Sequence, residues 1–259
     1  MTQHTALITG STSGIGLGIA TALAEQGHDV CLSGIEPIEQ GKEIAQEIAK
    51  KYGVSTSYYA GNLLDSEVAR AALAHCERTL ASVDILVNNA GMQHVEAIET
   101  FPPEKWCQII ELNLITAFHM IQAALPHMKA QGWGRIINNS STHGLIASPF
   151  KSAYAAAKHG LVGLTKAVAL EVGEYNITCN AVCPGYTWTP LIEGQIPDTA
   201  KARGISEQDV IEQVFLKEHA TKQFTQTSEI GAFVAFLSSD AAKNITGTAL
   251  PIDGGWTAK

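Results

Sequence analysis

The sequence predicts an α/β fold: a doubly wound parallel sheet with helices on both faces. Short, almost uninterrupted apolar runs alternate with longer segments of helical pattern along the 259 residues, as expected of parallel strands buried between helices. A glycine-rich turn directly after the first apolar run also favours this fold. Because neither a Pro/Ser-rich linker nor a fixed-period repeat divides the sequence, we expect a single domain over residues 1–259.

The individual elements follow from this alternation. The apolar runs expected as strands cover residues 5–9, 29–33, 55–60, 83–87, 135–139, 178–182 and 249–252. The helical patterns between them cover residues 14–26, 39–51, 65–80, 103–129, 153–172 and 229–238. We expect Asp65 or Ser66 to cap the third helix. Pro126 should kink the fourth helix or mark its last turn.

One segment breaks the alternation. Residues 189–225 form a long, polar and helical insertion between strands. Long connections of this kind are typical of lids over binding sites, so we expect a helical substrate lid. A plain surface excursion is the alternative.

Composition restricts the class of protein. The sequence is 46% hydrophobic and 16% charged, which is typical of a globular protein with a large core. A net charge of −8 disfavours nucleic acid and anionic membranes as partners. The five cysteines include no C-x-x-C pair, so we expect reduced thiols and no metal site. The first residues lack the basic region of a signal peptide, and we expect a cytoplasmic protein.

The glycine-rich turn predicts a dinucleotide site. Thr9–Gly16 joins the first strand to the first helix, with glycines at positions 10, 14 and 16. Such glycines allow a tight turn and close approach of a pyrophosphate, and the helix amino terminus supplies free N–H donors. The spacing is G-x-x-x-G-x-G, and the motif as a whole is one residue longer than G-x-G-x-x-G. The lysine of a nucleoside triphosphate loop is missing after the last glycine.

The end of the second strand favours NAD over NADP. Glu36 lies twenty residues past Gly16, where an acidic residue binds the ribose hydroxyls and repels a 2′-phosphate. Neither Ser33–Glu36 nor the turn Ser11–Ser13 contains a basic residue. Since the strand ends in Gly34-Ile35 rather than an aspartate, an exposed Glu36 is the alternative.

Tyr154 and Lys158 form a candidate proton-transfer pair. Positions i and i+4 of a helix share a face, with Cβ atoms about 5–6 Å apart. An ammonium beside a phenol stabilises the phenolate, so the lysine should lower the tyrosine pKa and make it a general base. Ser141 lies thirteen residues before Tyr154. A surface tyrosine and a solvated lysine on an alanine-rich helix are the alternative.

Together these motifs resemble the short-chain dehydrogenase/reductase family over essentially the whole chain. Besides the glycine turn and Tyr154-x-x-x-Lys158, the match in order and spacing includes Asn88-Asn89-Ala90-Gly91, Asn113, Ser141 and Pro184-Gly185. The resemblance implies a Rossmann-type sheet with Tyr154 as acid/base, Lys158 on the nicotinamide ribose, Ser141 on the substrate oxygen and Asn113 holding a water. The NAD-binding residues that the resemblance and the turn imply are Gly10, Thr12, Ser13, Gly14, Ile15, Gly16, Glu36, Asn62, Leu63, Asn89, Ala90, Gly91, Tyr154, Lys158, Pro184, Gly185, Thr187 and Thr189.

Polar loop residues around this centre suit a small carboxylate. The candidate substrate-binding residues are Gln93, Ser141, His143, Lys151, Tyr154, Trp188, Gln195 and Trp256. The lysine would supply charge, the amides and imidazole directed donors, and the tryptophans a wall. This set resembles the bacterial family members that act on D-3-hydroxybutyrate, which implies NAD-linked interconversion of (R)-3-hydroxybutyrate and acetoacetate. The ending Asp253-Gly254-Gly255-Trp256 resembles tetrameric members.

Other substrates and roles stay open from the sequence. A small polyol, a sugar or a 3-oxoacyl thioester is the alternative substrate, although a neutral sugar offers Lys151 no charge. A binding protein that kept the fold without catalysis is disfavoured by the intact Asn113, Ser141, Tyr154 and Lys158.

Overall fold

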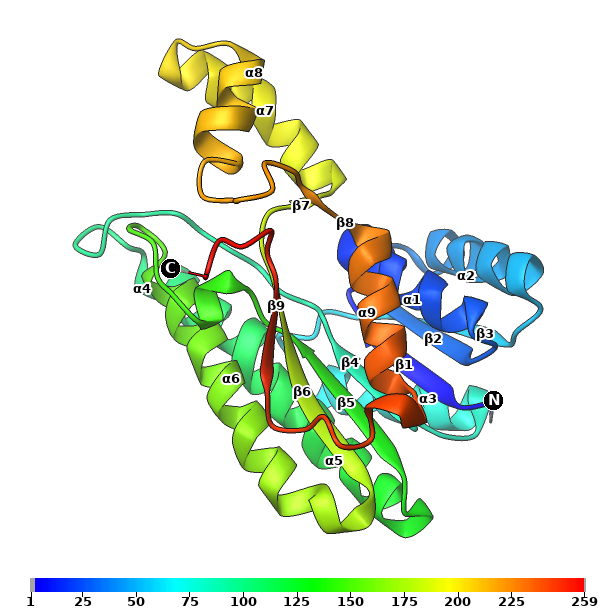
Figure 1. Cartoon of the computed structure of the whole chain (residues 1–259). Helices are drawn as coiled ribbons and strands as arrows, with labels where there is room; N and C mark the ends of the chain where they lie inside the picture. Colours follow the sequence, from blue (N-terminus) through cyan, green and yellow to red (C-terminus); the bar gives the residue numbers. More distant parts are fainter. Residues whose placement is uncertain (1–2, 259) are drawn as a thin grey trace.

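A parallel sheet between two helical layers forms the protein (Figure 1). The computed structural model describes residues 3–258, apart from the side chains of Leu191, Asp198 and Ala202. The strands, in the order β3-β2-β1-β4-β5-β6-β9, pair in parallel throughout. They are β1 (Thr5–Thr9), β2 (Asp29–Gly34), β3 (Thr56–Ala60), β4 (Ile85–Asn88), β5 (Gly134–Asn139), β6 (Ile177–Pro184) and β9 (Ala249–Ile252). The predicted fold class is confirmed, and each expected strand is present within a few residues.

Alternation along the strands builds two cores. In β1, Ala6 and Ile8 face the core beneath α1 (Gly14–Glu25), α2 (Ile38–Tyr52) and α9 (Thr227–Ser238). Leu7 faces the opposite core, beneath α3 (Ser66–Leu80), α5 (Thr116–Gln131) and α6 (Ser152–Val172). Both faces of the central strands are therefore covered, which explains why these strands read as nearly continuous apolar runs, whereas the edge strands β3 and β9 are only partly buried.

The expected helix over residues 103–129 is one continuous rod with an irregular middle. It consists of α4 (Pro103–Ile110), a π-helical turn η1 (Glu111–Ile115) and α5. Pro126 lies inside α5 and not at its end. The whole rod Pro103–Gln131 is apolar and long enough to cross a membrane, and here it packs against the sheet and α6.

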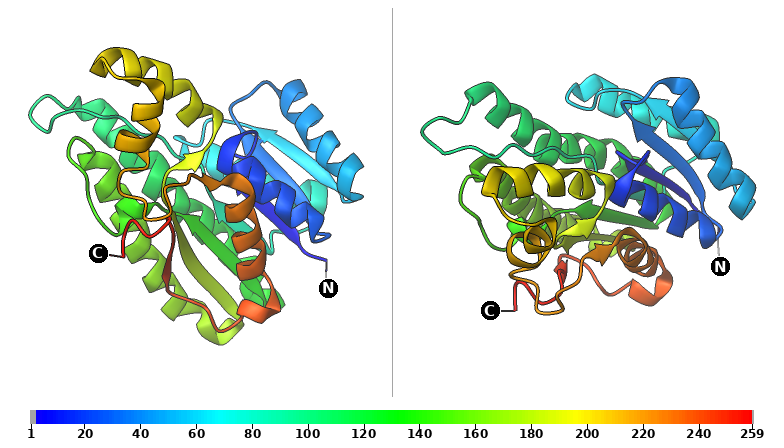
Figure 2. Two further views of the ribbon diagram at one scale, coloured as in Figure 1. Left: turned by 45° about the horizontal axis from the view of Figure 1, so that its top comes forward. Right: turned by 90° about the horizontal axis from the view of Figure 1, so that it is seen from above.

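The segment between β6 and α9 forms a small unit of its own above the carboxyl ends of the strands (Figures 1 and 2). It contains α7 (Pro190–Arg203), α8 (Glu207–Asp209) and the π-helical turn η4 (Val210–Phe215). Its base is a two-residue parallel pair of β7 (Thr187–Trp188) and β8 (Thr225–Gln226), which the sequence pattern did not predict. The unit has its own apolar cluster around Ile196, Val210 and Phe215.

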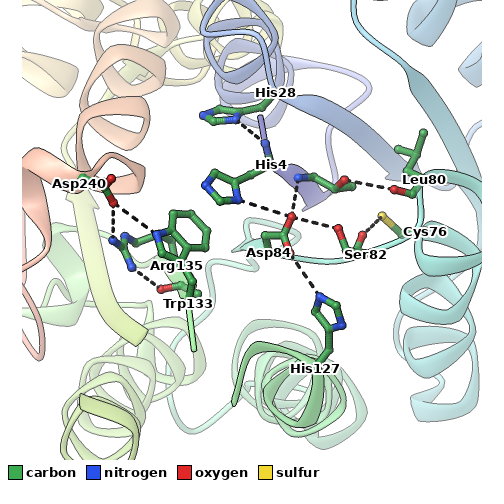
Figure 3. Close-up of polar contacts among 12 residues, drawn as sticks. His4, His28, Cys76, Leu80, Ser82, Asp84, His127, Trp133, Arg135 and Asp240 are labelled. Carbon is green, nitrogen blue, oxygen red and sulfur yellow. Dashed lines mark hydrogen bonds and ion pairs between the residues drawn. The ribbon is translucent and has the colours of Figure 1, made fainter. Parts of the chain in front are cut away.

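The amino ends of the strands meet at the opposite pole, where polar side chains tie them together (Figure 3). Asp84 accepts hydrogen bonds from the Thr5 backbone N–H and the Ser82 hydroxyl. His4 stacks on Trp133 at 3.7 Å between ring centroids, and the buried Arg135 guanidinium reaches Asp240 at 3.3 Å. This pole lies away from the carboxyl ends, where an open parallel sheet binds ligands.

Candidate active site

The carboxyl ends of the strands open into a cavity of about 1000 Å³. It runs along the point where the strand order reverses, between β1 and β4. Every residue predicted to bind the cofactor lines it, as does Asn113. The predicted substrate residues that line it are Gln93, Ser141, His143, Lys151, Tyr154, Gln195 and Trp256.

The glycine turn at one end of the cavity is shaped for close approach. Gly10 and Gly14 have φ values of +61° and +54°, which favour glycine. A Cβ on Gly16 would collide with the Gly10 carbonyl oxygen and with Asn89. The Ser13 side chain makes no capping hydrogen bond to α1, so the N–H groups of its first turn are left for an anion.

Glu36 lies at the same end, just past β2. Its carboxylate folds over Gly34, where an added Cβ would collide with Glu36 Oε2. That oxygen is buried and has no hydrogen-bond partner among the described residues. A buried acceptor without a partner fits a ribose hydroxyl, so the alternative of a purely solvent-facing Glu36 is excluded.

An asparagine pair holds the strand ends in place between the two halves of the cavity. Asn89 Nδ2 donates to Thr9 O at 2.9 Å and to Gly10 O at 2.8 Å. Asn89 Oδ1 accepts from Asn139 Nδ2 at 2.8 Å. The side chain of Asn89 thus ties the glycine turn to β5, and the resemblance to the family did not reveal this bracing role.

The catalytic candidates converge at the carboxyl end of β5. Ser141 follows β5, and its Oγ accepts from the His143 backbone N–H at 3.1 Å. Tyr154 and Lys158 lie on consecutive turns of α6, with Lys158 Nζ 5.5 Å from the centre of the Tyr154 ring. Lys158 is 4% exposed and donates to Asn139 O at 2.8 Å. The predicted shared helix face is therefore present.

The prediction that Lys158 lowers the pKa of Tyr154 is wrong for the protein without a bound cofactor. Burial raises the pKa of the Tyr154 phenol, and its interaction with the Ser141 hydroxyl lowers the pKa by less. Burial also lowers the pKa of Lys158 to about 8. Desolvation disfavours the charged form of each group, so it outweighs the attraction that i, i+4 spacing suggested.

Asn113 lies in the π-helical turn η1, which the sequence pattern did not predict. Its Nδ2 donates to Ile109 O and to Met92 O, both at 2.9 Å. Its Oδ1 is buried and finds no partner among the described residues, and a Cβ on Gly91 would lie 2.6 Å from it. The side chain is thus fixed with one acceptor free, as the holding of a water requires.

The other end of the cavity is aromatic and cationic. Tyr186 and Trp256 stack at 5.3 Å between ring centroids, and Lys151 Nζ lies 5.7 Å from the Tyr186 ring. Burial lowers the pKa of Lys151, and no described side chain forms an ion pair with it. His143 is 4% exposed, and burial, helped by Lys151, lowers its pKa to about 4. The imidazole is therefore neutral near pH 7 and bonds the Ser148 hydroxyl at 3.0 Å.

Comparison with known proteins places this site in a family. A family model described as enoyl-(acyl carrier protein) reductase matches residues 10–257, from the glycine turn to the C-terminal turn. The chain belongs to the short-chain dehydrogenase/reductase family.

Two relatives in this family are similar over nearly their full length. The chain is 49% identical over 255 residues to D-beta-hydroxybutyrate dehydrogenase of Rhizobium meliloti (strain 1021), covering 98% of this chain and 99% of that one. It is 46% identical over 256 residues to the enzyme of the same name from Cupriavidus necator, covering 98% of each. A solved structure of L-sorbose reductase from Gluconobacter frateurii, complexed with NADPH and L-sorbose, is similar with a TM-score of 0.94 at 31% identity. The match covers 100% of this chain and 98% of that one. This short-chain dehydrogenase/reductase is therefore an oxidoreductase of nicotinamide type.

Trp188 is the predicted substrate residue that the structure places elsewhere. Its ring packs on Phe224 at 5.1 Å between ring centroids within the apolar cluster of the lid unit, and it does not line the main cavity. Tyr186, two residues earlier, provides the aromatic wall instead. Tyr186 and Trp188 both pack against the lid cluster, but Tyr186 also stacks on Trp256 and lines the cavity. The short strand β7, which begins between them, could not be recognised from the sequence.

Arg203 also lines the cavity and was missed. It ends α7. Burial raises the pKa of Tyr186 and the charge of Arg203 opposes this rise, which places the guanidinium on the side of Lys151. Arg203 is an exposed cation in a polar segment, so nothing in the sequence distinguished it from an ordinary surface residue.

Proposed function

We propose that the protein oxidises (R)-3-hydroxybutyrate to acetoacetate with NAD and catalyses the reverse reduction. The observation that carries this proposal is the distribution of charge along the cavity. Lys151 and Arg203 lie at the substrate end, whereas Glu36, the one carboxylate among the described side chains of the lining, lies at the opposite end. Lys151 is half-buried and Arg203 is exposed, and two cations at one end of a cavity favour an anionic ligand over a neutral one.

NAD is the proposed cofactor because of Glu36. Its buried and unpartnered oxygen suits the 2′- and 3′-hydroxyls of the adenosine ribose, and its charge would repel a 2′-phosphate. The residues around it, Gly34, Ile35 and Gly61, include no cation that would bind such a phosphate. When bound, the nicotinamide accepts or gives the hydride and, in its oxidised form, carries a positive charge.

The protein's own part in the reaction is proton transfer and orientation. In oxidation the phenol of Tyr154 would first lose its proton, and the positive charges of Lys158 and of the bound nicotinamide would favour the phenolate against the effect of burial. The phenolate would then take the substrate hydroxyl proton, while the hydride passes from the carbinol carbon to the nicotinamide. Ser141 beside the phenol holds the same substrate oxygen, which gains charge as the proton leaves. Lys158 and the free oxygen of Asn113 provide the path by which the proton reaches water.

The carboxylate of the substrate would lie at the cationic end. Lys151 supplies charge from the start of α6, while neutral His143 and the exposed Gln93 and Gln195 would supply hydrogen-bond donors. Arg203 on the lid offers a second, planar donor that matches a carboxylate. A small acid fits this arrangement because the stacked Tyr186 and Trp256 limit its length.

The test is NADH formation with (R)- and (S)-3-hydroxybutyrate, a panel of polyols and both NAD and NADP. We expect turnover with the R acid and NAD, and at most weak turnover with NADP. Activity confined to polyols, sugars or 3-oxoacyl thioesters would overturn the choice of substrate. A preference for NADP would overturn the role of Glu36. The variant Glu36→Gln tests this role directly, because it removes the charge and keeps the size of the side chain.

We further propose that the chain works as one domain and as a homotetramer in the cytoplasm, with neither nucleic acid nor membrane as partner. The predicted domain limits at residues 1 and 259 lie outside the described residues. Phe118 on α5 and Leu170 on α6 expose 43% and 88% of their surface, which supports pairing of these helices between subunits. Sedimentation equilibrium tests this proposal: a monomer would contradict it, and Leu170→Glu should dissociate the assembly.

A further inference from the structure

His219 is a fully buried histidine that the proposed chemistry does not use. It lies between η4 and β8, at the end of the lid unit, and is 0% exposed. Its Nε2 accepts the Tyr186 backbone N–H at 3.2 Å, and its Nδ1 lies 3.0 Å from Gln223 O. Because an N–H only donates and a carbonyl only accepts, the ring must be neutral with its proton on Nδ1.

This imidazole supports the aromatic wall of the substrate end. Its ring lies 6.1 Å from that of Tyr186 and 5.6 Å from that of Trp256, measured between centroids. Tyr186 and Trp256 line the cavity, and His219 does not. His219 thus contacts residues of the cavity wall but does not itself line the cavity.

Three segments that are distant in sequence close around the ring. A Cβ on Gly185, in the turn after β6, would lie 2.9 Å from His219 Cε1. A Cβ on Gly254, in the C-terminal turn, would lie 3.1 Å from His219 Nδ1. Next to the ring, the Thr221 N–H donates to Gly254 O at 3.1 Å. The lid segment, the β6 turn and the C-terminal turn are therefore joined through one side chain.

The charged and titratable groups that face His219 come from each of these segments. Asp253 in the C-terminal turn favours its protonation, Lys222 of its own segment opposes it, and the Tyr186 phenol lies across the stack. Burial is the largest effect and lowers the pKa of His219. Protonation would remove the acceptor of the Tyr186 N–H and leave that buried donor unpaired.

We propose that His219 is a positioning residue, whose neutral imidazole fixes Tyr186 and Trp256 and thereby the substrate end of the cavity. This inference rests on the proposed function only in taking that end as the place where the substrate binds. It implies that substrate affinity, and not the chemical step or cofactor binding, depends on this ring.

The test compares His219→Leu and His219→Gln with the wild-type protein, using the substrate on which the panel above shows turnover. Leucine removes the acceptor, so KM should rise about five- to tenfold, the value of one lost neutral hydrogen bond, with kcat and NADH affinity close to wild type. Glutamine offers both an acceptor and a donor and should restore most of the affinity. His75→Leu, on α3 away from the cavity, is the matched control and should leave KM unchanged.

The pH profile provides a readout that a merely structural role would not move. Wild-type KM should rise as the pH falls below the pKa of His219, whereas KM of His219→Gln should not show this rise. A wild-type KM in folded His219→Leu, or the same acid rise in His219→Gln, would overturn the proposal. Should the leucine variant not fold, the profile of the glutamine variant decides. Absence of turnover with 3-hydroxybutyrate would count against the proposed function alone.

Discussion

At the scale of single residues, burial decides the charge state of the active-site groups. Lys158, at 4% exposure, has its pKa lowered to about 8, and His143, equally buried, has its pKa lowered to about 4. Burial raises the pKa of the Tyr154 phenol, because desolvation disfavours the phenolate anion just as it disfavours the cations of lysine and histidine. The resting protein thus keeps its proton on the tyrosine.

Replacing Tyr154 by phenylalanine tests the proton-transfer role. Tyr154→Phe removes the acid/base oxygen but keeps the ring in its packing, so turnover should fall by at least about a thousandfold. NADH affinity, measured by fluorescence titration, should stay near that of the wild type. Turnover within tenfold of the wild type would contradict the role of Tyr154.

Removing the ammonium of Lys151 tests the position of the carboxylate. Lys151→Ala should raise KM by the equivalent of about 1.5–3 kcal/mol, the value of a hydrogen bond to a charged group, with a smaller effect on kcat. Steady-state kinetics with the hydroxy acid measure the change. Lys201→Ala removes a lysine of α7 that does not line the cavity, and it should leave KM unchanged. Equal KM values in the two variants would show that Lys151 does not meet the carboxylate.

At the scale of elements, irregular turns place the functional groups. The π-helical turn η1 interrupts the rod from α4 to α5 at Asn113, whose Nδ2 donates to Ile109 O and Met92 O while its Oδ1 stays free among the described residues. The short pair β7–β8 lies at the base of the lid unit, where Tyr186 lines the cavity and Trp188 packs on Phe224. The π-helical turn and the two-residue strand pair are both short irregular features, which local sequence does not encode strongly.

The contact between α1 and α9 is set by two glycines. A Cβ on Gly18 would lie 2.7 Å from Thr227 O, and one on Gly231 would lie 2.5 Å from Gly18 O. Gly231→Val should force these helices apart and lower the free energy of unfolding by about 1–3 kcal/mol. Because α1 begins at the glycine turn, NADH affinity should fall as well.

Urea unfolding and NADH titration of Gly231→Val measure both effects. Ala232→Val adds similar volume at the next, exposed position of α9 and serves as the control. If the two variants were equally stable, the close contact of the helices would have no energetic role.

At the scale of the whole molecule, the sheet separates two poles with different chemistry. The carboxyl ends hold the cavity, and the amino ends hold the cluster of His4, His28, Asp84 and Trp133 (Figure 3). His28 Nδ1 accepts the His4 backbone N–H at 3.2 Å, which it can do only while unprotonated. Burial lowers the pKa of both histidines.

The lowered pKa values of the histidines predict loss of stability in mild acid. For His4, His28, His143 and His219 the folded pKa lies below the unfolded value, so the unfolded chain binds protons more readily. Stability should be full above about pH 6.5, the unfolded value, and should decrease as the pH falls toward the folded values.

Urea midpoints at about pH 7.5 and about pH 5 measure this decrease, in a range where most carboxylates stay ionised. His28→Asn keeps an acceptor for the His4 N–H but cannot be protonated, so it should reduce the decrease. A midpoint that is constant or rises toward pH 5 would contradict the prediction.

The sequence predicted the strands, the flanking helices and nearly all residues of the cavity, because these depend on local patterns. Apolar runs, the glycine turn and the i, i+4 spacing of Tyr154 and Lys158 are such patterns. It did not predict Arg203 or His219, since each is a single polar residue in a polar segment whose place depends on how the lid folds back. The sequence also assigned Trp188 to the aromatic wall and did not predict Tyr186, because the place of each ring depends on how the lid folds back.

By itself, then, the sequence determined the α/β fold, the carboxyl-end location of the site and the chemical types of its groups. Only the tertiary structure decided the protonation states and the shape of the substrate end. Ionisation depends on how far a group is removed from water, and the wall of Tyr186, Trp256 and His219 comes from three segments that meet only after folding. Spacing along the chain carries neither kind of information.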